Sequence, residues 1–202
     1  MQKRIVLLIM LSLLCFQTLP AKQRFYFNTG INKPLSPSAF KDYWRSGFNL
    51  GAGTGFVLNP HFEIAAVFSF DQMQLDDNAF LKSITQSNDV YSSVLGGTTS
   101  IFDIIAALKY KVPTPNHPNV TPYLTAAMGV SDKIIGKKEV STEEDYFEEA
   151  RENDILPSAG IGMGFEIVTA KNTSLVIEGS FQFLFGKETT IYFPLKFGIV
   201  LN

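Results

Sequence analysis

Cysteine is almost missing from this sequence, since Cys15 is the only one among 202 residues. A single thiol forms no intrachain disulfide, so a small scaffold held together by disulfides is excluded. Histidine is nearly as scarce, with only His61 and His117. Zinc and related metals are held by clustered cysteines and histidines. The sequence therefore predicts no metal site and no cofactor.

Long apolar runs are also missing beyond residue 21, which excludes a transmembrane helix from the rest of the chain. Residues 1–21 begin with the basic pair Lys3-Arg4 and continue as an apolar run too short to cross a bilayer. They end at Ala21, a small residue suited to cleavage. This pattern predicts a cleaved export signal peptide over residues 1–21 and a single mature domain over residues 22–202.

The sequence also lacks a strong excess of positive or negative charge, and its formal net charge is only −2. This balance argues against nucleic acid as a partner. Aromatic side chains are abundant instead, with 18 Phe, and 46% of all residues are hydrophobic. This aromatic content is high for a soluble protein without a helical core, and a barrel embedded in lipid would use it.

Alternation of apolar and polar residues is the main structural signal. A period of two indicates β-strands whose successive side chains point to opposite faces. Eight segments show it, each long enough for a tilted spanning strand. They cover residues 25–32, 46–58, 62–72, 99–112, 121–131, 157–168, 173–185 and 190–201.

The connections between these segments alternate between short and long. Tight turns at one rim and long loops at the other are typical of outer-membrane barrels, which have an even number of strands. We therefore predict an all-β fold, an eight-stranded antiparallel up-and-down transmembrane β-barrel. If the first strand runs outward from the periplasm, the long loops 33–45, 73–98 and 132–156 all lie outside the cell and are expected to contact an unknown extracellular partner.

The direction of the apolar row separates two kinds of barrel. A membrane barrel turns this row outward to lipid and keeps the polar row inside. A soluble, lipocalin-like ligand binder would bury the same row inside. Phe181, Phe197 and Ile64 belong to this row, and we predict that they point outward.

Charged residues recur on the opposite, polar row. The interior of an eight-stranded barrel is just wide enough for side chains to fill it, so we favour a paired network that plugs the lumen over a polar pore. Register suggests two pairs, Glu63 with Lys111 and Glu178 with Lys196. The expected lumen network comprises Glu63, Asp103, Lys109, Lys111, Glu166, Glu178 and Lys196, and Asp71 falls on the same row.

Local signals predict details of the loops and of the last strand. Ser36-Pro37 is a helix start, with Ser36 as the cap. A capping-box spacing over residues 141–144 precedes an acidic segment, which we interpret as a solvated loop rather than a Ca²⁺ site. Pro194 cannot donate to a strand ladder, so we expect a bulge or a gap in pairing there.

Several of these segments resemble the OmpA-type eight-stranded outer-membrane β-barrel family, over essentially all of residues 24–202. The resemblance implies a Gram-negative cell envelope, outer-membrane lipid and the barrel assembly machinery as partners, and a monomer. It is uninformative about activity. The segments that carry it are Asn59-Pro60-His61-Phe62, Pro122-Tyr123-Leu124, Gly160-Ile161-Gly162-Met163-Gly164-Phe165 and Phe193-Pro194-Leu195-Lys196-Phe197-Gly198.

The expected function is that of a non-enzymatic outer-membrane protein, with loops for surface interaction or a role in envelope integrity. Both histidines fall in predicted inner turns, which argues against a hydrolytic site facing the outer leaflet. A porin-like conduit or carrier for small apolar molecules is one alternative, and it requires a gap in the lumen. The soluble lipocalin-like binder is the other.

Overall fold

The computed structural model describes residues 22–84, 91–115, 119–142 and 146–202, and it shows a closed barrel of eight antiparallel strands. Each barrel strand pairs with the next barrel strand along the chain, and β1 pairs with β11 to close the barrel. The predicted fold class is therefore confirmed, whereas the predicted signal peptide lies outside the described residues. The barrel strands are β1 (Lys22–Ser36), β2 (Gly47–Val57), β3 (Phe62–Met73), β5 (Thr99–Lys111), β6 (Val120–Ile135), β9 (Glu152–Ala170), β10 (Thr173–Phe185) and β11 (Thr189–Leu201).

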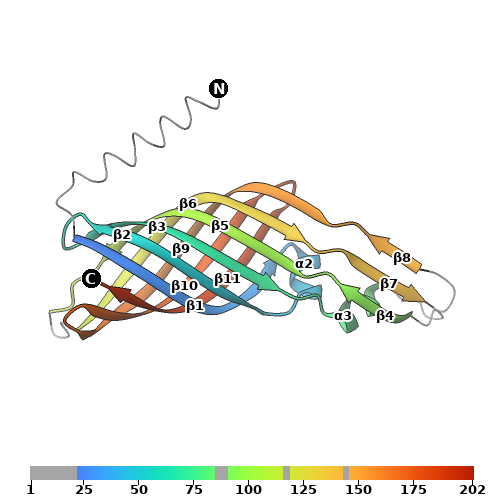
Figure 1. Cartoon of the computed structure of the whole chain (residues 1–202), viewed down its shortest axis with the longest axis horizontal. Coiled ribbons are helices and arrows are strands. Elements are labelled where there is room, and N and C mark those ends of the chain that lie inside the picture. The colour runs from blue at the N-terminus through green and yellow to red at the C-terminus, as the bar shows by residue number, and fades with distance from the viewer. Residues whose placement is uncertain (1–21, 85–90, 116–118, 143–145) are drawn as a thin grey trace, which may run out of the picture.

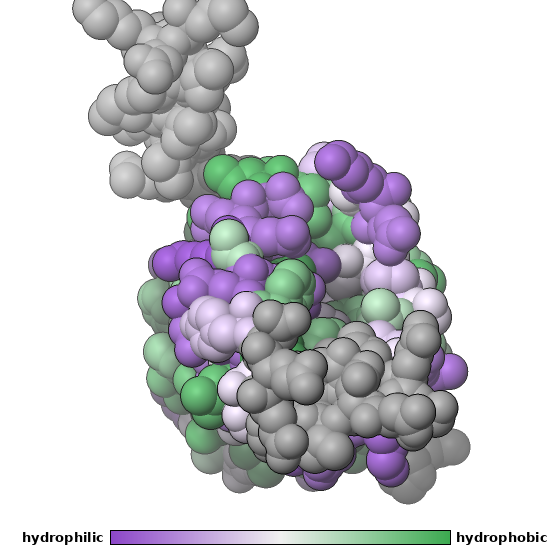
Figure 2. Space-filling view, turned by 90° about the vertical axis from the view of Figure 1, so that its right-hand side faces the viewer, coloured by the Kyte–Doolittle hydropathy of each residue, from purple (hydrophilic) through white to green (hydrophobic). Residues whose placement is uncertain are grey.

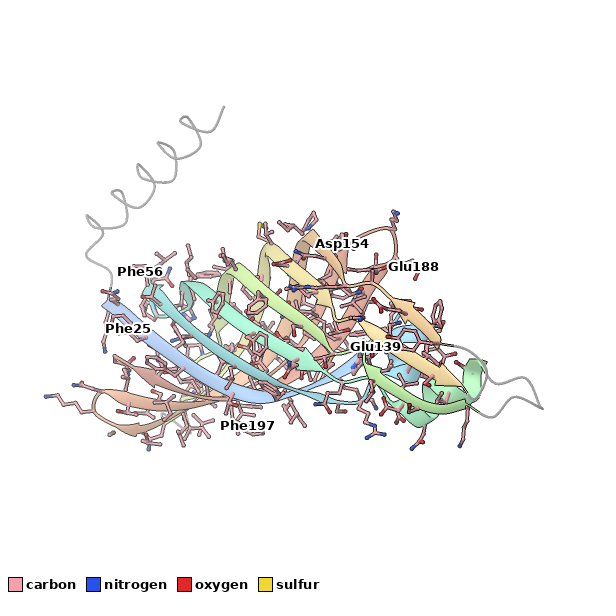
Figure 3. All side chains as sticks on the ribbon, turned by 45° about the vertical axis from the view of Figure 1, so that its right-hand side comes forward. Phe25, Phe56, Glu139, Asp154, Glu188 and Phe197 are labelled. Carbon is pink, nitrogen blue, oxygen red and sulfur yellow. The ribbon has the colours of Figure 1, made fainter. Side chains whose placement is uncertain are left out.

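The apolar row of each strand lies on the outside of the barrel. Phe25 and Phe197 keep 47% and 48% of their surface exposed, and Figure 3 shows both on the outer wall. The polar row is buried, and Glu63 is fully inaccessible. The predicted direction of the two rows is confirmed. A soluble ligand-binding barrel would require the opposite arrangement.

Tight turns join the strands at one end of the barrel. In the turn between β2 and β3, the Asn59 side chain accepts hydrogen bonds from the backbone N–H groups of His61 and Phe62, each at 2.9 Å. Asparagine stabilises turns in this way. His61 is exposed there, as expected, and His117 lies outside the described residues.

The other end carries the two helices and three short strands that complete the described secondary structure (Figure 1). Helix α2 (Ser38–Tyr43) follows β1, and helix α3 (Asp77–Ile84) follows β3. Strands β4 (Tyr91–Gly96), β7 (Lys138–Thr142) and β8 (Tyr146–Glu149) form a separate three-stranded sheet in the order β4-β7-β8. We call this sheet the extension. No helix in the described part of the chain is long and apolar enough to cross a membrane.

Two loop predictions need correction. Helix α2 begins one residue later than predicted, with Pro37 at the N-cap and no side-chain cap. The acidic segment interpreted above as a solvated loop is instead partly extended, since β7 continues to Thr142 and β8 spans Tyr146–Glu149. Pairing of β7 with β4 and with β8 orders this segment, and it holds Val140 in a buried position.

Pro194 meets the expectation of a gap in pairing. The ladder between β10 and β11 passes from Gly179↔Leu195 to Gln182↔Tyr192 without a change of register and without partners for Phe193 and Pro194. The backbone of Pro194 has no N–H to donate, so pairing with β10 is interrupted there, and the register of the two strands is the same on both sides of the gap.

Candidate functional site in the barrel lumen

Four charged side chains form a compact cluster in the lumen near the turn end, and we call it the turn-end quartet. It consists of Arg24, Glu63, Lys111 and Glu166. Arg24 Nη1 lies 2.7 Å from Glu63 Oε2 and also contacts Glu166. Lys111 Nζ lies 2.8 Å from Glu63 Oε2 and 3.1 Å from Glu166 Oε2. Two cations therefore balance two carboxylates in a buried site, as burial of charge requires.

A second layer lies between the quartet and the middle of the barrel. Glu178 Oε2 accepts a hydrogen bond from Tyr123 Oη at 2.9 Å, while Glu178 Oε1 lies 3.9 Å from Lys196 Nζ. Lys109 has no hydrogen bond to a carboxylate here. Its ammonium lies 4.2 Å from the centre of the Tyr26 ring and 4.9 Å from that of Tyr123, so aromatic faces offset part of its desolvation.

A small cavity of about 50 Å³ adjoins this layer, and Lys109, Glu178, Gln182 and Lys196 are among its lining residues. This volume suits one or two water molecules with polar partners rather than a transported solute.

Two further carboxylates, Asp71 and Asp103, lie deeper towards the loop end. Asp71 Oδ1 accepts hydrogen bonds from the side-chain amides of Asn32 and Asn49, both at 2.7 Å. Tyr192 Oη lies 3.0 Å from Asp103 Oδ2 and 3.4 Å from Asp71 Oδ2.

An apolar cap closes the lumen at the loop end. Phe40 of α2 is buried there, and Lys133 lies over its ring at 5.5 Å from the centroid. Trp44 and Leu156 pack against the cap as partly buried residues. Helix α2 thus places an aromatic side chain in the mouth of the barrel. The cap consists of Phe40, Met73, Ile101, Leu184 and Tyr192.

The structure brings the sequence-derived network together in part. Glu63, Lys111 and Glu166 meet in the quartet, and Lys109, Glu178 and Lys196 form the second layer. Asp103 lies apart from both groups, beside Asp71 and Tyr192. Within the described residues there is no group of three or more His, Cys, Asp or Glu placed to hold a metal ion.

Arg24 was missed by sequence reasoning. It lies just before the first predicted strand and contacts residues far along the chain, Glu63 and Glu166. It falls on the same row as Tyr26, so extending the alternation by one step towards the N-terminus would have found it.

The loop end holds a second set of charges, and it is exposed. Figure 2 looks onto this end, where hydrophilic residues are prominent, while hydrophobic residues line the flank. A pocket of about 600 Å³ opens between the start of β9 and the β10–β11 turn, and Asp154 and Glu188 line it. Figure 3 shows both residues at this end together with Glu139 of the extension.

An ion pair fixes the start of α3. Arg45 Nε lies 3.0 Å from Asp76 Oδ2, and Asp76 Oδ1 accepts a hydrogen bond from the Ala79 N–H at 3.2 Å. The hydrogen bond from Arg45, supported by the one from Ala79, lowers the pKa of Asp76 to about 2. Asp76 therefore caps the helix in its charged form.

Solved structures with the same fold are eight-stranded outer-membrane β-barrels. Neisserial surface protein A is 14% identical to this chain, with a TM-score of 0.57, and the match covers 89% of this chain and 96% of that one. The outer membrane protein OprG from Pseudomonas aeruginosa is 9% identical, with a TM-score of 0.51 and coverage of 90% and 97%. No protein-family model and no curated protein sequence matches the chain. At these identities the likeness establishes the fold.

Proposed function

We propose that this protein spans the outer membrane of a Gram-negative cell as a closed monomeric barrel of the OmpA type, and that it displays a folded extension for contact with an extracellular partner. Its export would use residues 1–21 as a signal peptide, and the barrel assembly machinery would insert it. The observation that carries the proposal is the distribution of side chains, which is the inverse of that in a soluble protein. Large apolar groups lie on the outside, and ion pairs are buried within.

This distribution suits lipid. A closed barrel leaves no unpaired strand edge, which is a condition for spanning hydrocarbon. Aromatic side chains gather near both ends of the outer wall, as in the interfacial girdles of membrane barrels. Phe62 packs against Tyr110 near the turns, with ring centroids 5.2 Å apart. Phe70 packs against both Phe48 and Phe102 near the loop end, at 5.7 and 4.8 Å.

A conduit is the less favoured role, because every level of the lumen is obstructed. Four groups of side chains follow one another along the barrel axis. They are the turn-end quartet, the second layer, the Asp71–Asp103 pair and the apolar cap. Opening a path would require breaking buried ion pairs and moving Phe40. Each of these steps is costly.

The extension is built as a rigid platform. Leu75, Val94 and Val140 form a small hydrophobic core between α3 and the sheet, and Trp44 packs against it. Lys137 joins two strands of the sheet through ion pairs of 2.7 Å to Glu139 and 2.9 Å to Glu148. A preordered surface loses less conformational entropy on binding, which favours recognition over passive display.

Exposed aromatics on this platform point to contact with a partner. Tyr146 and Phe147 of β8 keep 60% and 55% of their surface exposed. Tyrosine and phenylalanine are enriched in protein interfaces. We propose no enzymatic activity, since the sequence has only two histidines and the described one, His61, lies in the tight turn between β2 and β3, at the end opposite the extension.

Fractionation and single-channel recording together test the proposed function. The protein should appear in the detergent-extracted outer-membrane fraction, and folded protein should leave a planar bilayer without steady conductance. Protease added to intact cells should cut within residues 136–151 while the barrel remains protected. Recovery in the periplasmic wash would refute the membrane assignment, and steady conductance would refute the closed lumen.

A further inference from the structure

Strand β9 has a free edge outside the barrel. Its ladder with β10 ends at Ser158, opposite Leu184, whereas its ladder with β6 continues to Glu152. Between Glu152 and Pro157, no strand in the described part of the chain pairs with β9 on the side of β10. Beyond this stretch comes β8, the edge strand of the extension (Figure 1). An unpaired edge offers its N–H and C=O groups to another chain.

One face of this edge borders a pocket at the loop end of the barrel. Glu152, Asp154 and Leu156 share that face of β9, and all three line the pocket of about 600 Å³ described above. Glu188 of the β10–β11 turn also lines it, and Figure 3 shows Glu188 and Asp154 at the same end of the barrel. Because β10 ends before β9 does, the pocket opens beside the free edge. We call the pocket and residues 152–157 together the rim notch.

Carboxylates outnumber cations in the rim notch. Among the described residues, no salt bridge reaches Glu152, Asp154 or Glu188. Lys133 lines the pocket as well, but its ammonium donates a hydrogen bond to a threonine hydroxyl of β11 at 2.9 Å. The other cation of the lining, Lys187, lies in the exposed β10–β11 turn. The pocket therefore presents a net negative charge and has room for a further cation.

The composition of the whole edge favours a basic partner strand. Residues 146–157 contain four acidic side chains and one basic side chain, Arg151. Two copies of such an edge would repel each other, because like charges on neighbouring strands destabilise pairing. A basic strand meets no such repulsion. Ile155, on the outer face, keeps 74% of its surface exposed and offers an apolar contact to a strand beside it.

We propose that the rim notch binds an extended basic segment of the extracellular partner, which adds a strand to the free edge of β9. This inference rests on the proposed function and names the chemistry of the partner. The segment would occupy the position in the sheet that β10 leaves empty beyond its end. Its backbone would pair with β9, and alternate lysine or arginine side chains would face Glu152 and Asp154. About six extended residues, roughly 20 Å long, would cover the edge.

Peptide binding to the protein refolded in detergent micelles tests this proposal. The probe is a fluorescently labelled peptide of about six residues in which lysine and valine alternate, and fluorescence anisotropy measures its Kd. The double variant Glu152→Gln/Asp154→Asn should raise this Kd by about tenfold or more. Asp77→Asn, at the exposed start of α3, makes the same kind of change outside the notch and should leave the Kd unchanged.

Two further probes separate strand pairing from simple attraction between charges. Two peptides are methylated on alternate backbone nitrogens, one on its lysines and the other on its valines. At least one of them should bind about tenfold more weakly or worse, because it lacks the donors that face β9. Spermidine has positive charge but no peptide backbone, so it should not displace the peptide at equal concentration.

Hydrogen exchange gives a readout that needs no variant. Peptide binding should slow deuterium exchange of backbone amides between Glu152 and Leu156, since those on the free edge gain acceptors. Exchange of the α3 amides should not change.

Several results would overturn the proposal. They are absence of peptide binding, equal Kd values for wild type and the double variant, full binding of both methylated peptides, and displacement by spermidine. A dimer formed through β9 without peptide would overturn it too, since a second copy would then be the occupant. None of these results would alter membrane fractionation or conductance, so the proposed function is tested separately.

Discussion

Arg24 is the residue on which the turn-end quartet depends most, because it contacts both carboxylates. Replacing it by Gln leaves Glu63 and Glu166 with Lys111 alone. We expect Arg24→Gln to lower the free energy of unfolding by about 3–5 kcal/mol, the usual effect of removing one partner from a buried ion pair. Urea unfolding of the refolded barrel measures this change.

Arg45→Gln is the matched control for that experiment. The same substitution at Arg45 breaks an ion pair with Asp76 that is partly exposed, with 56% of the Arg45 side chain accessible. Exposed pairs contribute little to stability. The urea midpoint for global unfolding of Arg45→Gln should therefore equal that of wild type within experimental error. If both variants lost the same free energy of unfolding, the buried quartet would contribute no more to stability than the exposed Arg45–Asp76 pair.

Asp76 provides a prediction about pH outside the barrel. Its pKa of about 2 lies below the ordinary value of about 3.9 for an aspartate. A lowered pKa stabilises the folded loop above the ordinary value, and this contribution disappears as the pH falls towards 2. In Arg45→Gln the NMR titration midpoint of the Asp76 carboxyl should rise towards 4. An unchanged midpoint would contradict the role of Arg45.

At the scale of elements, α2 closes the lumen through a single side chain. Phe40 is buried in the apolar cap, whereas Ser38 on the same helix is exposed. We expect Phe40→Ala to lower the free energy of unfolding by about 3–5 kcal/mol, the range for emptying a buried aromatic site. Ser38→Ala should have little effect. Chemical denaturation of both variants compares them, and matching curves would mean that α2 is not part of the cap.

The barrel strands could be predicted because alternation extends over each whole span. Phe62 to Met73, for example, keeps a strict inward and outward order, and both ends have recognisable turn residues. Lipid outside and a narrow lumen inside impose this period at every residue. Sequence alone therefore predicted the eight strands of the barrel and the faces to which their apolar and polar rows point.

The extension escaped prediction for a physical reason. Strands β4, β7 and β8 have six, five and four residues, too few for periodicity to show. Their pairing depends on contacts across the chain, such as Val94↔Val140. The grouping of Asp71 and Asp103 with other polar side chains was not predicted for the same reason, since Asn32, Asn49 and Tyr192 come from three other strands. Local patterns do not encode which distant side chains meet.

At the scale of the whole molecule, the surrounding lipid sets the cost of a charge by depth. Phe68 pairs with Ala52 and Ile104 midway along the barrel, whereas Phe62 lies at the turn end opposite Tyr110. In bilayers, Phe68→Arg should cost about 2–4 kcal/mol and Phe62→Arg about 0–1 kcal/mol. Urea titration in lipid vesicles measures both. Similar costs at the two depths would place Phe68 outside the hydrocarbon.

Strands β6 and β9 continue from the barrel wall beyond its rim in an unbroken ladder that engages all 16 residues of β6. A pulling force applied to the extension would run parallel to these strands. Such a load shears many interstrand hydrogen bonds at the same time, and it does not break them one after another. The β6–β9 ladder would therefore distribute a force applied to the extension along the full height of the barrel wall.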